Sequence, residues 1–214
     1  MKNSKNLVFA AIALFVAATA VFPQAKTPVY SYNAQKAFIP PDLGKVYLGM
    51  PLREFVKQID ITNAVSQYPY SYLELDIPFS KGNITGLRVR VHGLTPEQLD
   101  ELHVEEKVKK KDSSGYDYEV SVKRPRVAGI PSDGVVYSMY VSFAPDFELK
   151  NWAAKTYGKG EVRAKDDKYY FYDEQWMKRS GDGLGWMIRA FYKTGPGLLQ
   201  LLGRVPGSEW DPEA

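Results

Sequence analysis

A strict alternation of apolar and polar residues beside a short turn limits the fold of this chain more than any other feature. Tyr116, Tyr118, Val120 and Val122 alternate with Asp117, Glu119, Ser121 and Lys123. A run with a period of two puts successive side chains on opposite faces, as a β-strand does. Residues 104–111 precede this run, and Asp112-Ser113-Ser114-Gly115 supplies the turn. We therefore predict a β-hairpin over 104–123 and antiparallel pairing in the rest of the chain.

Further strand and helix patterns follow one another along the chain. Strands are expected at 44–48, 70–77, 84–92, 134–143, 168–177 and 184–193, and a short apolar segment at 198–202. Helices are expected at 51–59, 95–102 and 145–157. These patterns predict an α+β fold, with antiparallel sheet and two main helices, the first and the third, packed on one face. Because a strand runs into a helix in both 44–130 and 131–205, we also consider the hypothesis of two related halves.

The start of the chain has the features of an export signal. Lys2 and Lys5 form a basic start, an apolar run over 7–20 follows, and Ala18-Thr19-Ala20 fits a cleavage site. The run is shorter than the roughly 20 residues of a membrane-spanning helix, so cleavage near Ala20 is preferred over an uncleaved anchor. We predict a signal peptide at 1–20, an extended Pro-rich arm at 21–43 and a single compact domain at 44–214. The expected location is periplasmic or secreted, with no stable membrane span after cleavage.

Composition excludes several classes of function. Removing residues 1–20 leaves 26 basic and 25 acidic residues, which is not the strongly basic balance of a nucleic-acid-binding protein. The chain has no cysteine, so it has no disulfide, no thiolate metal site and no thiol nucleophile. We expect no nucleic-acid partner and a fold that is stabilised by packing alone.

The sequence gives little support for a catalytic centre. The two histidines, His92 and His103, lie in neither a metal-ligand pair nor a nucleophile motif, and no phosphate-binding glycine loop is present. Three carboxylate pairs leave a hydrolase open, because acid–base hydrolysis needs only two well-spaced carboxylates. These pairs are Glu74 with Asp76, Asp166 with Asp167, and Asp173 with Glu174. We predict no catalytic residue, no metal site and no cofactor.

Aromatic and basic residues are the candidates for partner binding. Aromatic residues make up 14% of the chain, and exposed Tyr and Trp are typical of protein interfaces and sugar platforms, although most aromatic rings serve the core. A lysine cluster at 107–111 either protects an edge strand from β-pairing or binds an anionic lipid or polysaccharide. The residues expected to contact a partner are Tyr70, Tyr72, Lys109, Lys110, Trp176 and Trp186.

Two stretches resemble known families. Residues 44–55, Gly-Lys-Val-Tyr-Leu-Gly-Met-Pro-Leu-Arg-Glu-Phe, resemble the strand, Gly-Met and helix opening of SmpA/OmlA-type and β-lactamase-inhibitor-like small envelope domains, and 134–137 with 157–160 are similar to a later segment of such domains. That resemblance implies a non-enzymatic envelope module that assembles with or grips a protein. Many members are lipoproteins, and this chain has no cysteine for a lipid.

The second stretch is Leu75-Asp76-Ile77-Pro78-Phe79 followed by residues 84–93. It resembles a stretch of the sheath proteins of spirochaete periplasmic flagella, in which a strand follows an Ile-Pro-Phe motif. That family is a β-sandwich that coats a filament, and its aromatic residues on this strand are replaced here by Arg88 and Arg90. The resemblance implies a structural role in a larger assembly.

Taken together, these observations favour an exported, non-enzymatic structural or interaction protein of the bacterial periplasm or envelope. Its expected partner is a larger protein assembly, with the sheath of a periplasmic flagellar filament as one case. The alternative is a carbohydrate- or peptidoglycan-binding module, with a glycan as partner. The third hypothesis is a carboxylate-dependent hydrolase.

Overall fold

The computed structural model describes residues 30–67, 72–131, 133–162, 172–179, 185–193, 195–205 and 208. The helices are α1 (Tyr32–Gln35), α2 (Leu52–Phe55), α3 (Pro96–Glu101) and α4 (Leu149–Tyr157), with 3-10 turns η1 (Pro41–Leu43) and η2 (Val127–Gly129). The strands are β1 (Met50–Pro51), β2 (Val65–Gln67), β3 (Leu73–Ile77), β4 (Ile84–His92), β5 (His103–Lys111), β6 (Asp117–Pro125), β7 (Val135–Phe143), β8 (Glu161–Val162), β9 (Glu174–Arg179), β10 (Gly185–Phe191) and β11 (Leu198–Gly203).

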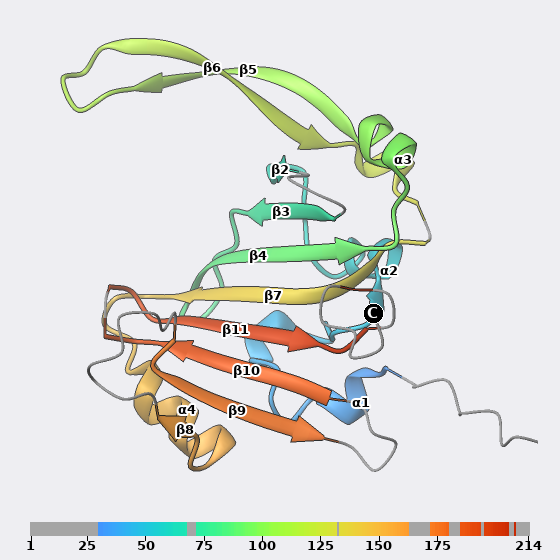
Figure 1. Ribbon diagram of the computed structural model, residues 1–214. Helices are drawn as coiled ribbons and strands as arrows, with labels where there is room; N and C mark the ends of the chain where they lie inside the picture. The colour runs from blue at the N-terminus through green and yellow to red at the C-terminus, as the bar shows by residue number, and fades with distance from the viewer. Residues whose placement is uncertain are drawn as a thin grey trace, which may run out of the picture.

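The body of the molecule is one antiparallel sheet with the strand order β2-β3-β4-β7-β11-β10-β9-β8, and β1 pairs with β7 (Figure 1). The mostly antiparallel sheet with short helices confirms the α+β fold class. Strand β7 takes β4 on one side and β11 on the other. The sheet therefore runs without a break through both segments that were considered as halves.

The core lies on one face of this sheet. Alternate residues of neighbouring strands face each other in register and are fully buried, including Leu75 opposite Val89, Val89 opposite Met139, and Met139 opposite Leu201. Both α2 and α4 bury side chains against this face, Phe55 from the first and Leu149 from the second. The opposite face has mainly polar residues, as expected for an antiparallel sheet with one covered side.

The described part of the predicted arm, residues 30–43, is folded against the core and is not extended. Gln35 is fully buried, and its side-chain amide donates to the carbonyl of Leu48 at 2.7 Å and accepts from the Leu48 N–H at 2.8 Å. Phe38 packs on Trp186, and its carbonyl accepts a hydrogen bond of 2.9 Å from the hydroxyl of Tyr157. The segment folds onto the core because its apolar side chains are buried there, whereas an extended arm would leave them in water.

Two local predictions near residue 50 differ from the structure. The helix predicted at 51–59 is regular only over α2. Beyond it, the backbone N–H groups of Val56 and Ile59 still donate to the carbonyls of Leu52 and Phe55. The apolar face of the predicted helix is buried as expected. The strand predicted at 44–48 is absent, and the pairing with β7 occurs at β1. Gln35 has taken up the hydrogen bonds of Leu48, which removes that residue from strand pairing.

The other two predicted helices are present. Thr95 and Gln98 form the predicted capping box at the start of α3, and α4 ends before Gly158, whose φ is 80°. Among the helices in the described residues, only α4, with nine residues, has the length expected of a main helix. None of the helices in the described ranges is long and apolar enough to cross a membrane.

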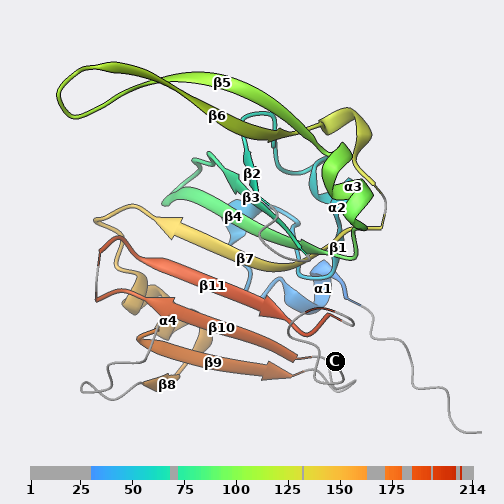
Figure 2. The same cartoon turned by 45° about the horizontal axis from the view of Figure 1, so that its top comes forward.

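The predicted hairpin is confirmed as β5 and β6, which pair with each other along nine residues each and form a separate two-stranded sheet. It leaves the body at α3 and projects past β2 (Figures 1 and 2). At its base, Arg124 contacts Glu106 and donates to the carbonyl of Asn63 at 2.8 Å. This contact fixes the base of the hairpin to the segment that leads into β2.

Candidate functional site

The hairpin has one charged face and one largely apolar face. On the charged face, cross-strand neighbours include Lys109 opposite Glu119, and Lys111 opposite Asp117 with their charged atoms 3.8 Å apart. On the other face, Val108 lies opposite Val120, and the adjoining pairs are Glu106 with Val122, Lys110 with Tyr118, and Val104 with Arg124. An isolated two-stranded hairpin is only marginally stable in water, so an apolar face without cover is costly. Val104 and Tyr118 are 45% and 41% exposed.

The apolar side of the hairpin bounds a cleft of about 560 Å³ above the polar face of the main sheet. Val108 and Val122 line the hairpin wall, together with the cationic side chains of Lys110 and Arg124. The sheet wall has polar side chains, Asp76 on β3, Arg88 on β4, and Tyr140 and Ser142 on β7. Its lining also includes the apolar residues Val65, Ile77, Pro78, Leu87 and Leu198. We call this space the hairpin cleft. Both walls combine apolar with charged or polar side chains, which suits a ligand that has groups of both kinds.

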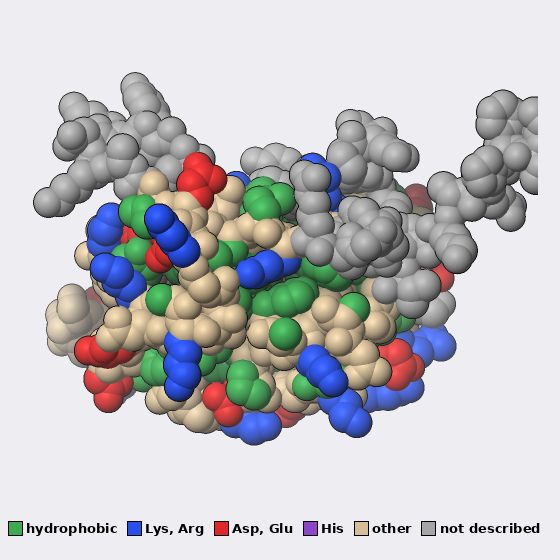
Figure 3. All heavy atoms as spheres, turned by 90° about the horizontal axis from the view of Figure 1, so that it is seen from below, with side chains coloured by type: hydrophobic (Ala, Val, Ile, Leu, Met, Phe, Trp, Pro, Cys, Tyr) green, Lys and Arg blue, Asp and Glu red, His purple; other side chains and the backbone are tan. Residues whose placement is uncertain are grey.

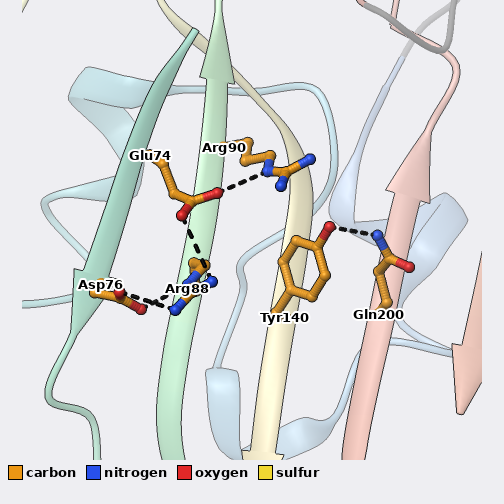
Figure 4. A network of polar contacts seen from close by, with 6 residues as sticks. All are labelled: Glu74, Asp76, Arg88, Arg90, Tyr140 and Gln200. Atoms are coloured by element: carbon orange, nitrogen blue, oxygen red, sulfur yellow. Dashed lines mark hydrogen bonds and ion pairs between the residues drawn. The ribbon is translucent and has the colours of Figure 1, made fainter. Parts of the chain in front are cut away.

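A network of ion pairs holds the sheet wall in place (Figure 4). Arg88 donates to both carboxylate oxygens of Asp76 from Nε and Nη2, at 2.7 and 3.0 Å, and its third nitrogen, Nη1, lies 3.6 Å from Glu74. Arg90 donates to the other oxygen of Glu74 at 2.8 Å. Two arginines therefore share two carboxylates across β3 and β4, and the wall has little net charge.

Aromatic rings enclose the inner end of this network. The guanidinium of Arg90 lies 4.9 Å from the ring centroid of Tyr72 and 5.2 Å from that of Tyr140, a cation–π geometry on both sides. The side-chain amide of Gln200 donates to the hydroxyl of Tyr140 at 2.6 Å. These contacts extend the network across four strands, from β3 to β11 (Figure 4).

The pairing affects the protonation of the two arginines. The hydrogen bond to Asp76 raises the pKa of Arg88 against the opposing effect of burial. Burial acts to lower the pKa of Arg90, but the hydrogen bond to Glu74 and the nearby tyrosines outweigh it and raise the pKa. Both guanidinium groups therefore stay charged at neutral pH.

Of the five predicted partner residues that the structure describes, one lies in the cleft. Lys110 lines the cleft, whereas Lys109 lies on the opposite, charged face of β5. Tyr72 is buried, 9% exposed, and stacks on Arg90 at the end of the network. Tyr70 lies outside the described residues.

The two predicted tryptophans belong to the core. Trp176 is 4% and Trp186 2% exposed, and they pack on Tyr157 and Phe38 respectively. The indole N–H of Trp176 donates to the carbonyl of Gly158 at 3.0 Å. Buried rings cannot form a platform for a sugar, so these two positions are unsuited to the role predicted for them.

The carboxylate pairs have structural partners. Glu74 and Asp76 are held by arginines, as described above. Asp173 accepts from the backbone N–H groups of 192 and 193 at 2.7 and 3.0 Å, and Glu174 accepts from the Gly160 N–H at 3.0 Å. Burial and the charge of Glu174 raise the pKa of Tyr192 to about 12. Asp166 and Asp167 lie outside the described residues.

Among the described residues, no group of three or more His, Asp or Glu side chains is arranged to hold a metal ion. Seen from the β8 and β9 end of the molecule, basic and acidic side chains are interspersed with apolar ones and do not gather in a patch of one sign (Figure 3). His103 lies at the start of β5 with its Nδ1 at the Leu99 carbonyl, and burial lowers its pKa.

Sequence reasoning missed the network of Arg88, Arg90, Tyr140 and Gln200. A pattern was present, because acidic residues two apart at 74 and 76 and basic residues two apart at 88 and 90 occur in successive predicted strands. Antiparallel neighbours with such spacing place opposite charges on one face. The register of β3 on β4 decides which charges meet, and the sequence does not specify that register.

Comparison with protein-family models, curated protein sequences and solved structures returned no match for this chain. The site must therefore be interpreted from its own geometry.

Proposed function

We propose that this chain is an exported, non-enzymatic interaction protein of the cell envelope, which holds a segment of a partner protein in the hairpin cleft. The observation that supports the proposal most directly is the mixed apolar and charged lining of the open hairpin cleft. Val108 and Val122 face the charged pair of Arg88 and Asp76 across open space. Apolar and charged side chains that share an open cleft are both in contact with water, so a ligand with apolar and polar groups that match them is favoured.

An extended polypeptide has the required chemistry. Its side chains alternate, so apolar residues can contact the valines while polar residues and backbone groups face Arg88, Tyr140 and Ser142. The cleft has a volume suited to a few residues of such a segment. Partner binding would also cover the part of the hairpin that lies beyond its contact with β2, and so would stabilise the hairpin.

The local resemblances of 44–55 and 75–93 agree with a role in an envelope assembly. Because residues 75–93 resemble flagellar sheath proteins, a flagellar filament sheath is the assembly to test before others. The glycan-binding alternative loses its two predicted tryptophan contacts, because both rings are buried. No observation in the described residues favours the hydrolase.

Site-specific photo-crosslinking tests the proposal in the organism that encodes the chain. A photoreactive benzoylphenylalanine at Val122 faces the cleft, whereas the same group at Ser121 faces away on the same strand and serves as the matched control. We expect protease-sensitive adducts with one defined protein from position 122 and few from position 121. Equal adducts from both positions, adducts with glycan, or adducts only with another copy of this chain would contradict the proposal.

A further inference from the structure

The outer edge of β5 pairs with no other strand among the described residues. Strand β5 is paired along its whole length with β6. On the body side it is β6 that lies beside β2, through Arg124. Along residues 104–111 every side chain except the half-buried Val108 is exposed. A nine-residue strand with a free edge is a template for another strand.

Charges along β5 are divided between its two ends. Glu105 and Glu106 lie in the first half, and Lys109, Lys110 and Lys111 lie in the second half. Two such strands in parallel would place acid beside acid and lysine beside lysine. Two copies in antiparallel orientation place each acidic half opposite a basic half, and the two-fold symmetry repeats the match.

We propose that two copies of this chain pair antiparallel along β5, about a two-fold axis that passes through Val108. In this register Glu106, which also contacts Arg124 of its own hairpin, lies opposite Lys110 of the partner subunit. Glu105 lies opposite Lys111 of the partner subunit. Side chains that oppose each other in antiparallel pairing share a face, and the register satisfies this because Val108, Glu106 and Lys110 all lie on the cleft side of β5.

The register also joins the two hairpins into one four-stranded sheet with matched rows. Val108 already lies opposite Val120, so the two-fold axis creates a row of four valines on the cleft side. On the other face, Glu105 lies opposite Lys123 and Lys111 lies opposite Asp117, so the outer rows alternate in charge. Three or more strands with an apolar face are far more stable than an isolated hairpin.

Lysines on an edge strand ordinarily discourage pairing, and this register does place Lys107 opposite Lys109 of the partner subunit. Glu119 lies opposite Lys109 within each hairpin and offsets part of that repulsion. The four ion pairs from the two acidic halves and the valine row favour association. The proposal does not depend on what occupies the hairpin cleft.

The absence of native cysteine makes single-cysteine crosslinking a direct test. In full-length Val108→Cys, the two thiols meet at the axis, so mild oxidation is expected to give a covalent dimer. In Val120→Cys the thiols are about 14 Å apart across three strand spacings, and in Lys107→Cys they lie diagonally beyond disulfide reach. Both serve as controls for position and register. Dimer that forms equally in all three variants, or in none, would overturn the proposal.

Charge reversal supplies a second test that a misfolded variant cannot imitate. Glu106→Lys and Lys110→Glu each place like charges opposite each other in a homodimer, so each is expected to weaken self-association by roughly tenfold. Mixed together, the two variants place opposite charges at both contacts and are expected to form a heterodimer. Sedimentation measures all three associations. A mixture that associates no more strongly than either variant alone refutes the proposed pairing.

Discussion

Glu74 on β3 accepts a hydrogen bond of 2.8 Å from Arg90 on β4, and both side chains are largely withdrawn from water, at 10% and 22% exposure. Replacing Glu74 with Ala leaves the guanidinium of Arg90 poorly solvated and without its partner. We expect Glu74→Ala to lower the free energy of unfolding by about 2 to 3 kcal/mol in urea denaturation.

The matched control is Asp76→Ala on the same strand. Asp76 and Arg88 are 41% and 46% exposed, so solvent can replace their pairing. The expected loss is below about 1 kcal/mol. Equal losses for the two variants would show that burial does not govern this network.

Gln35 offers a second test of stability. Its amide satisfies both backbone groups of Leu48 inside the core. Gln35→Leu fills a similar volume but leaves a buried N–H and a buried carbonyl without partners, and we expect a loss of about 2 kcal/mol or more. Asn33→Ala changes an exposed residue of the same helix and is expected to alter the unfolding midpoint only slightly.

Because Trp176 and Trp186 are buried, we expect their replacement to reduce stability and not to remove a binding contact. Trp176→Ala and Trp186→Ala each remove a large ring from the core, so each is expected to cost about 3 to 5 kcal/mol of stability. Chemical denaturation with tryptophan fluorescence measures this loss. If either variant kept native stability while losing a ligand, the buried placement of that ring would be wrong.

His103 should make stability depend on pH. Burial is the main cause that lowers its pKa in the folded chain, with Lys123 acting in the same direction and the Leu99 carbonyl and Asp100 acting against it. The unfolded chain, with an ordinary pKa of about 6.5, then binds the proton more tightly than the folded chain. Stability should fall as the pH drops below about 6.5 toward the lowered folded pKa, and His103 should contribute no pH dependence above that range.

Comparing wild type with His103→Gln between pH 7.5 and 5.5 isolates this effect, because carboxylates titrate in both proteins. The variant should show a shallower loss of unfolding free energy over this range. Identical slopes would assign the pH dependence to other groups.

Much of the fold could be predicted from local pattern. The alternation at 116–123 predicted β6, and the Thr95 and Gln98 pair predicted the start of α3, because both are decided by neighbours within a few residues. The segment 30–43 was predicted as extended because it has prolines and no periodicity. Its actual conformation depends on Gln35 reaching Leu48 and Phe38 reaching Trp186, and such distant contacts leave no local trace.

The candidate site was less predictable than the fold. Lys110 could be singled out by its charge, but the hairpin cleft exists only because the hairpin turns its valines toward β4 and β7. The tryptophans were misassigned because ring type alone does not show which face of a strand is covered. In both cases, the unforeseen cleft and the misassigned tryptophans, the residue types were known but the direction in which the side chains point was not.

The position of β11 has a consequence for the order of events during folding. This strand comes from residues 198–203, yet it lies in the interior of the sheet, between β7 and β10. While the chain emerges from start to finish, β7 and β10 cannot be bridged until these late residues arrive. Such distant pairing predicts slow, all-or-none maturation, and a nascent chain that waits with two open edges is the species that a chaperone would need to shield.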